Sequence, residues 1–382
     1  MIKGDAGMES IYTWSEHTKR ESFRGASGGG DGVHVLTGPI AVDGAEPGDV
    51  LKVEIVDLRP RANPDGKTYG SNANAWWGFQ ARVPKADGSS YDAGAFTSTP
   101  GWNDEVITIY ELASDDAGTY ATSSYAFKWP TLTDPEGVER DYIKYPGTCV
   151  PHDVHGDTTP TSAVADMGWT KASDITYMDD VFKARVPVNM HVGCMGLAPA
   201  SHAAVDSIPP MPSGGNLDDK RIGVGTTMFY PVEVAGALLS MGDAHMAQGD
   251  SELDGTGIET SITGDFKITL IKAADLEPWQ QGLDFPMGET AEHWIVHSFT
   301  EIDYLETYAA NPGDIYGASS IDDAMKNCYT QTRKFLMAKY GLTDAEAATF
   351  ITVGVDFATT QLVDGNWGVH AEIPKAMFEA TA

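Results

Sequence analysis

The stretch that decides the fold is residues 33–58, which read VHVLTGPIAVDGAEPGDVLKVEIVDL. In its second half the apolar residues Leu51, Val53 and Ile55 alternate with polar ones. Strict alternation with β-branched residues is typical of a strand that buries one face. The pattern therefore predicts a half-buried β-strand over residues 50–58.

Two groups of turn-forming residues divide the rest of this stretch. Residues 43–49 (DGAEPGD) precede the strand, and Thr37-Gly38-Pro39 predicts a second turn between short strands at 33–36 and 40–42. We therefore expect two or three strands joined by tight turns at the start of a β-rich chain.

Outward from this stretch, the sequence predicts more strands and a long insertion of loops. Residues 60–180 are rich in Gly, Asn, Ser and Pro, which favours loops. Within them, Trp76, Trp77 and Trp102 either wall a small apolar pocket or pack the insertion onto the body. Alternating or short apolar runs predict strands at 106–112, 125–129, 182–188, 192–197, 223–230 and 258–271, the last with a turn at Gly264-Asp265.

Helices are expected late in the chain. Residues 319–340 have helical apolar spacing, with Ser320 as the N-cap and Gly341 as the C-cap. Thr343 and Glu346 have the spacing of a capping box that opens a second helix. The predicted fold class is α+β, predominantly β. We expect a β-sandwich-like domain over 1–185 that contains the loop insertion of about 60–180, and an α+β domain over 186–382 that ends in the helical hairpin.

Composition limits the classes of function. The chain has 382 residues, 42% of them hydrophobic, which is enough for two globular domains. Its formal net charge of -30 disfavours binding to nucleic acid or to an anionic membrane and is compatible with a small neutral ligand. Cys149, Cys194 and Cys328 form no disulfide or zinc-knuckle pattern, and neither a signal peptide nor a membrane-spanning run is visible. We therefore expect a cytoplasmic protein.

The densest group of reactive side chains is the string GDAHMAQGDSE at 242–252. It holds Asp243, His245, Gln248, Asp250 and Glu252, all separated by small residues. A histidine with carboxylates nearby can hold a divalent metal, which lowers the pKa of the water that it binds. If Asp243 and His245 lie on one strand, they face the same side. The alternative interpretation is an acidic surface loop that contains a histidine by chance.

Four other groups have both a functional and a structural interpretation. Asn216 and Asp218 alternate within GGNLDDK and either point into a site or belong to a solvated turn. His34 begins the first strand region and is either functional or structural. The cluster 152–157 (HDVHGD) resembles metal ligands but has no recognised spacing. Cys194 is either a nucleophile with His191 as its base or an inert core residue.

The motifs taken together resemble the acetamidase/formamidase family. The sequence contains HVLTGPI at 34–40, GAEPGD at 44–49, GCMGLAP at 193–199, GGNLD at 214–218 and GDAHMAQGDSE at 242–252. Ser251 departs from the family's usual glycine. The resemblance covers about 33–58 and 186–272. It implies hydrolysis of formamide, acetamide or related short amides to a carboxylate and ammonia, a homo-oligomer (a dimer or larger), and a divalent metal, either zinc or calcium.

These motifs lead to a hypothesis for the site and to two rival functions. Asp218, Asp243 and His245 would hold the metal, with zinc as the first choice. Glu252 or Asp250 would activate water, and Asn216 and Gln248 would orient the amide, while His34 is a further catalytic candidate from the first motif. The rivals are a cysteine-dependent amidase that uses Cys194, and an inactive metal-dependent protein that only binds amides.

Overall fold

The computed structural model describes most of the chain outside two long segments. Predicted features at Trp76, Trp77, Trp102, Cys149 and the 152–157 cluster lie outside the described residues. The structure describes residues 34, 36–62, 66–74, 78–90, 106–128, 132–133, 139–140, 177–178, 181–201 and 205–379.

The chain divides into two compact units, each assembled from three segments. Unit 1 contains residues 1–35, 59–190 and 243–263, and unit 2 contains 36–58, 191–242 and 264–382. The predicted boundary at 185 lies close to the passage from one unit to the other at Met190–His191, and the domain division itself stays a prediction.

Unit 1 is built around antiparallel strands. They run in the order β14 (Glu259–Thr260), β3 (Tyr69–Asn74), β4 (Val106–Asp115), β5 (Gly118–Lys128) and β8 (Tyr177–Met178), and β9 (Arg185–Pro187) also pairs with β5. Strands β4 and β5 form a long hairpin with a turn between Asp115 and Gly118. A small core of Ala121, Met246, Ala247 and Ile258 lies against it. Unit 1 also contains η2 (Phe79–Arg82), β6 (Leu132–Thr133) and β7 (Glu139–Arg140).

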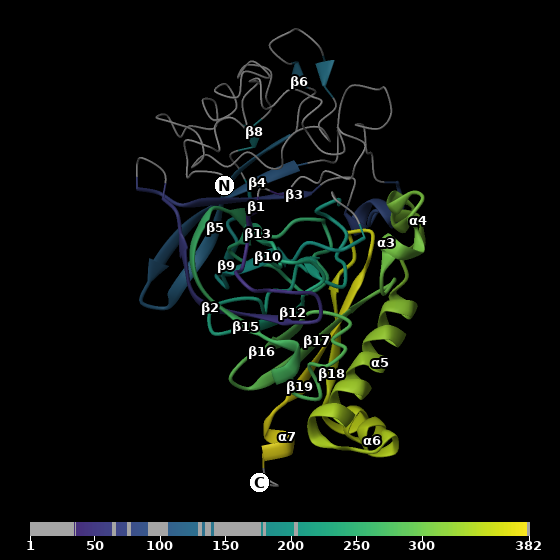
Figure 1. Cartoon of the computed structure of the whole chain (residues 1–382). Coiled ribbons are helices and arrows are strands. Elements are labelled where there is room, and N and C mark those ends of the chain that lie inside the picture. The colour runs from purple at the N-terminus through teal and green to yellow at the C-terminus, as the bar shows by residue number, and fades with distance from the viewer. Residues whose placement is uncertain are drawn as a thin grey trace. The chain divides into compact units, whose positions relative to one another are not determined.

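Unit 2 contains a second antiparallel sheet with helices packed on it. The strands run in the order β15 (Ile262–Ile271), β2 (Val50–Pro60), β12 (Thr227–Pro231), β16 (Met287–Glu289), β17 (His293–Phe299), β19 (Gly368–Pro374) and β18 (Asp356–Gln361). The long helix α5 (Ile321–Tyr340) runs beside β17 and β19 (Figure 1). Phe335 and Leu336 of α5 are buried in one apolar cluster with Trp294 and Ala371 of the sheet.

Unit 2 also contains shorter elements. The first part of strand β13 (Leu239–His245), up to Gly242, belongs to unit 2 and pairs with β1 (Leu36–Ile40). Strand β10 (His191–Gly196) pairs with β11 (Gly214–Asn216). The remaining elements are η6 (Ala273–Asp275), α3 (Tyr304–Thr307), η7 (Pro312–Asp314), α4 (Ile315–Ala318), α6 (Asp344–Gly354) and α7 (Ala376–Glu379). Among the described helices, none has both the length and the apolar character that crossing a membrane requires.

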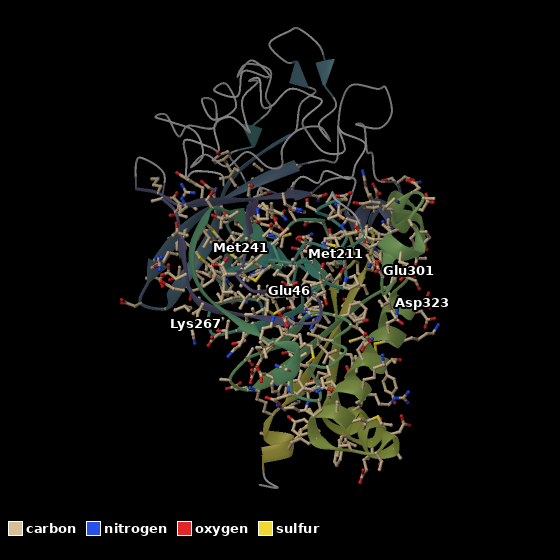
Figure 2. All side chains as sticks on the ribbon, in the orientation of Figure 1. Glu46, Met211, Met241, Lys267, Glu301 and Asp323 are labelled. Atoms are coloured by element: carbon tan, nitrogen blue, oxygen red, sulfur yellow. The ribbon has the colours of Figure 1, made fainter. Side chains whose placement is uncertain are left out.

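The helical hairpin is confirmed down to its caps. Ser320 accepts a hydrogen bond from the backbone N–H of Asp323, and Gly341 ends α5 with φ of +69°. Asp323 projects from the first turn of α5 (Figure 2), where a carboxylate interacts favourably with the helix dipole. Thr343 and Glu346 form the predicted capping box at the start of α6.

The predominantly β fold class is confirmed, whereas several predicted turns and loops are wrong. Residues 37–39 lie inside β1, which pairs with β13 through an irregular register, and Gly264–Asp265 lies inside the continuous strand β15. Residues 113–124, predicted as loop, form the β4–β5 hairpin. In each case pairing with a neighbouring strand decided the conformation against the local turn preference.

Candidate metal centre

The centre of the candidate site is His245, the last residue of β13, in unit 1. Its side chain is fully buried, and its backbone pairs with Glu259 of β14. The ring atom Nδ1 lies 2.8 Å from Oε1 of Gln248. Since a carbonyl oxygen only accepts, Nδ1–H donates, and this directs the lone pair of a neutral imidazole onto Nε2.

Two carboxylates flank Nε2 of His245. Oε1 of Glu259 lies 3.1 Å away and Oδ1 of Asp243 lies 3.5 Å away. Ligand atoms of His245, Glu252 and Glu259 also lie within 4.8 Å of one another. Ligands at about 2.0–2.1 Å from a tetrahedral zinc lie about 3.3 Å apart, so the two measured separations fit neighbouring ligands of one metal ion.

The ionisable groups in this cluster stabilise one another's charged forms. Burial lowers the pKa of His245, but Glu259 and Asp243 outweigh this effect and raise it well above its ordinary value. Burial raises the pKa of Asp243, but the His34 and His245 imidazoles outweigh it and hold that pKa far below the usual range. Carboxylates on two sides of one imidazole favour a positive charge at Nε2, which either a proton or a divalent cation supplies.

The structure places the other predicted site residues of unit 1 as follows. Nε2 of His34 is 3.7 Å from Oδ2 of Asp243, so the structure brings His34 to the cluster. Glu252 is buried, with 6% of its surface exposed. Asp250 is half-buried in the turn before it. Gln248 contacts the ring of His245 directly, which gives it an orienting role besides the predicted one toward substrate.

Strained backbone accompanies the reactive side chains. Asp243, Ser251 and Glu252 have φ values of +55°, +80° and +45°. L-residues rarely adopt this left-handed region, and such residues concentrate at functional sites. The position of Ser251, where the sequence departs from the family's usual glycine, is therefore one that favours glycine.

Asn216 and Asp218 lie in unit 2. Nδ2 of Asn216 donates to Oδ2 of Asp218 at 2.6 Å, and both side chains are buried. Asp218 also has a positive φ, of +46°. The two residues predicted to act together are thus in direct contact.

Sequence reasoning missed Glu259 and Asp254 in unit 1. Glu259 lies opposite His245 across the β13–β14 pair, so its position would follow from knowing the strand register. Burial raises the pKa of Asp254 to about 6, although a 3.0 Å hydrogen bond from Asn72 lowers it in part. Asp254 follows Glu252 by two residues, and closeness to the motif was its only signal in the sequence.

Cys194 has an environment that favours the structural interpretation. It is 3% exposed and lies on β10, where it is paired with Asn216. His191 is on the same strand three residues earlier, and side chains at that spacing face opposite sides of a sheet. His191 is therefore badly placed to be the base for Cys194.

A buried histidine with carboxylates around it, on antiparallel strands, has the donor set of a metal site. A model of the acetamidase/formamidase family matches residues 31–380. This chain therefore belongs to the acetamidase/formamidase family, and the resemblance seen in the motifs is confirmed.

Individual relatives agree with this assignment. The chain is 30% identical to an acetamidase from Mycolicibacterium smegmatis over 247 residues, 63% of this chain and 54% of that protein. It is 30% identical to a formamidase from Methylophilus methylotrophus over 249 residues, 63% of this chain and 52% of that protein. The matched region thus spans about half the length of these two relatives.

Solved structures share the fold. An acetamidase from Yersinia enterocolitica has a TM-score of 0.57 at 21% identity, over 90% of this chain and 74% of that one. An acetamidase from Bacillus halodurans has a TM-score of 0.56 at 20% identity, over 90% and 80% of the two chains. At these identities the likeness concerns the fold alone.

Proposed function

We propose that this protein hydrolyses short aliphatic amides, of the formamide and acetamide type, to a carboxylate and ammonia. Family membership supports the reaction class. The observation that carries the proposal is the pair of carboxylate oxygens at 3.1 and 3.5 Å from Nε2 of the buried His245. A cluster of this kind suits a divalent cation, which amide hydrolysis can use.

His245, Asp243 and Glu259 are the ligands of that cation in unit 1, and zinc suits their mixed nitrogen and oxygen donors. When bound, the cation would polarise the amide carbonyl and make water more acidic. Asp218 remains a further ligand predicted from the sequence. Gln248 holds His245 in the tautomer that presents Nε2.

Glu252 is the general base in this proposal. It is buried beside His245 and Glu259, with ligand atoms within 4.8 Å, so it can accept a proton from attacking water and return it to the leaving nitrogen. Asp250 is the alternative base, and His34 supports the charge of Asp243. Asn216 orients the amide through its side-chain amide group.

The proposal also covers the substrate, the partners and the location of the protein. The substrate is a small neutral amide, as the net charge of -30 favours, and neither nucleic acid nor a membrane is a partner. The protein is a homo-oligomer in the cytoplasm. Zinc is the first choice for the metal, and calcium is the alternative.

The first test is ammonia release from formamide, acetamide, propionamide and urea, before and after chelation and after zinc or calcium is added back. We expect release that chelation removes and one of the two metals restores. His245→Ala should lower kcat by at least about 10³-fold, because the cation loses a ligand and Glu252 loses its neighbour. His293→Ala, a half-buried histidine of β17, is the matched control and should keep wild-type turnover.

The same experiment separates the rival functions. Release that survives chelation and stops when Cys194 is alkylated would favour the cysteine-dependent amidase. No release from any amide, with binding of acetamide retained, would favour a protein that only binds amides. Wild-type turnover in His245→Ala would contradict the proposed site.

A further inference from the structure

Asn72 of strand β3 belongs to none of the sequence motifs, yet it holds the turn that leads from the 242–252 motif to strand β14. Its side-chain nitrogen Nδ2 lies between 3.0 and 3.3 Å from four oxygen atoms of residues 254–257. We propose that Asn72 is a positioning residue, which fixes the carboxylate of Glu259 against His245 through this turn. Asn72, the turn and both site residues belong to unit 1.

The four oxygens identify the group that Asn72 presents to the turn. They are a carboxylate oxygen of Asp254, the hydroxyl and carbonyl oxygens of Thr256 and the carbonyl oxygen of Gly257. Carboxylate and carbonyl oxygens only accept hydrogen bonds, so the side chain must direct its NH₂ group, and not its oxygen, toward them. The hydrogens of that group are shared among acceptors from three residues. One side chain therefore ties the beginning of the turn to its end.

Strand β3 is held against β14 independently of the Asn72 side chain. The backbone of Ser71 pairs with that of Glu259. Oγ1 of Thr260 also donates to the carbonyl of Tyr69 at 2.8 Å. These contacts set the register of the two strands. Replacing the side chain of Asn72 should therefore loosen the turn and leave the strand pair in place.

The end of the turn contacts both residues of the site. The backbone N–H of Gly257 donates to Oε1 of Glu259 at 2.9 Å. The same oxygen lies 3.1 Å from Nε2 of His245. A Cβ on Gly257 would lie 2.8 Å from the ring of His245, so the backbone of this residue packs directly on the imidazole. A shift of Gly257 would therefore change the separation between the carboxylate and the imidazole.

Glu259 depends on the turn more than His245 does. The side chain of His245 is 1% exposed and its Nδ1 is held by Gln248 at 2.8 Å. The side chain of Glu259 is 22% exposed, so packing alone does not fix the direction of its carboxylate. The N–H of Gly257 supplies that direction, as groups that hydrogen-bond to a metal-ligating carboxylate do. The effect of Asn72 should therefore reach the site mainly through Glu259.

The inference rests on the proposed function, because the residues that Asn72 positions are the ligands of the proposed cation. The two can nevertheless fail separately. The contact between the turn and Glu259 is measured in chelator, with neither metal nor substrate present. A chain that binds no metal would contradict the proposed function and leave the role of Asn72 to that measurement.

The first test is hydrogen exchange of the Gly257 amide in the full-length, chelator-treated chain, followed by NMR. Asn72→Ala should speed this exchange at least about tenfold, because the turn opens more often when its side-chain support is lost. Asn74→Ala is the matched control, since Asn74 lies two positions along the same strand and is exposed, with Oδ1 accepting from Nε2 of Gln80 at 2.9 Å. Its Gly257 amide should exchange at the wild-type rate.

The second test is titration of the same chains with Co²⁺, read by visible absorption, which reports the geometry of the ligands. Asn72→Ala should weaken Co²⁺ binding by about 10–100-fold and change the spectrum, as the loss of a ligand-orienting group does. In a Glu259→Ala background, Asn72→Ala should weaken binding by less than about threefold more, because the residue through which Asn72 acts is already gone. A purely structural role would give the same loss in both backgrounds.

Thermal unfolding in chelator shows whether the variants are folded. Asn72→Ala should remain folded, because the N–H of Ala73 still donates to Oγ1 of Thr256 at 2.9 Å. Asn72→Ser, whose shorter side chain cannot reach all four oxygens, replaces it if Asn72→Ala does not fold. If the folded variant exchanges the Gly257 amide within twofold of the wild-type rate, or loses Co²⁺ affinity equally in both backgrounds, the inference is wrong.

Discussion

Gly257 lies directly against the imidazole of His245. A Cβ at this position would be 2.8 Å from both Cγ and Nδ1 of the ring, which is too close for the ring to stay in place. Gly257→Ala should therefore displace His245 and lower both metal affinity and kcat by about 10–100-fold, the range found when groups that orient a ligand are lost. Metal titration and ammonia release measure the two effects.

The matched control for this change is Gly249→Ala in the same motif, where an added Cβ meets nothing within 4 Å. Its metal affinity should equal that of the wild type. If both variants lose metal affinity equally, the loss comes from a stiffer backbone in the motif and not from displacement of the His245 ring.

Ser251 provides a prediction about stability. Its φ of +80° costs an L-residue about 1–2 kcal/mol, whereas glycine adopts it freely. The greater freedom of glycine in the unfolded chain offsets about 0.4–1 kcal/mol of that gain. Ser251→Gly should therefore stabilise the protein by about 0.5–1 kcal/mol, measured by urea unfolding. Ser124→Gly within strand β5 should destabilise it, and a loss of stability in Ser251→Gly would contradict the strain argument.

At the residue scale, the sequence predicted contacts between residues that are near one another in the chain and missed contacts between residues that are far apart in it. Asp243, His245 and Gln248 are within six positions, and the structure brings them together. Glu259 and Asp254 were missed, because the first reaches His245 through a strand pair and the second is held by Asn72, which is 182 positions away in the chain. A single sequence contains no record of those long-range contacts.

At the element scale, the hairpin of α5 and α6 illustrates what local signals can determine. The side chain of Thr343 accepts the N–H of Glu346, while a Glu346 carboxylate oxygen accepts the N–H of Thr343 at 2.8 Å. Thr343→Ala should cost about 1 kcal/mol of unfolding free energy. Thr349→Ala, an exposed mid-helix position that bonds back to Ala345, should be neutral or stabilising. Equal losses in both would mean that the cap contributes nothing specific.

The strands show the limit of the same method. Helix caps depend on residues three positions apart, so they were predicted correctly. Strand β19 was not predicted, because it lies between β17 and β18 and is buried along most of its length, which removes the alternation of polar and apolar residues. Residues 37–39 were predicted as a turn because of Gly38 and Pro39, and pairing with β13 made them strand. Both errors arise from neighbours that are distant in sequence.

At the scale of the whole molecule, a net charge of -30 makes acid a general perturbation, because protonation changes many carboxylates at once. Asp219 nevertheless has an effect on acid stability that can be separated from this general one. Its oxygens lie 2.8 Å from Nε2 of His297 and 3.1 Å from a guanidinium nitrogen of Arg221. Burial raises the pKa of Asp219, but His370, His297 and Arg221 outweigh it and hold that pKa well below the usual value.

A carboxyl group whose pKa is lowered by folding stabilises the native state above its unfolded pKa of about 3.9, and this contribution is lost as the pH falls below that value. Asp219→Asn should therefore cost about 3–5 kcal/mol at pH 7, the usual cost of breaking a buried ion pair. The difference in unfolding free energy between the wild type and Asp219→Asn should shrink as the pH falls from 5 to 3, because the wild type then loses the stabilisation by the Asp219 carboxylate, which the variant lacks at every pH.

Urea unfolding of both proteins at pH 7, 5 and 3 measures this difference. Subtracting the variant's unfolding free energy from that of the wild type removes the effect of the other carboxylates, which the two proteins share. Asp356→Asn, with an exposed side chain, should follow the wild type at every pH. A difference for Asp219→Asn that stays constant down to pH 3 would mean that the ion pair with His297 and Arg221 does not contribute to acid sensitivity.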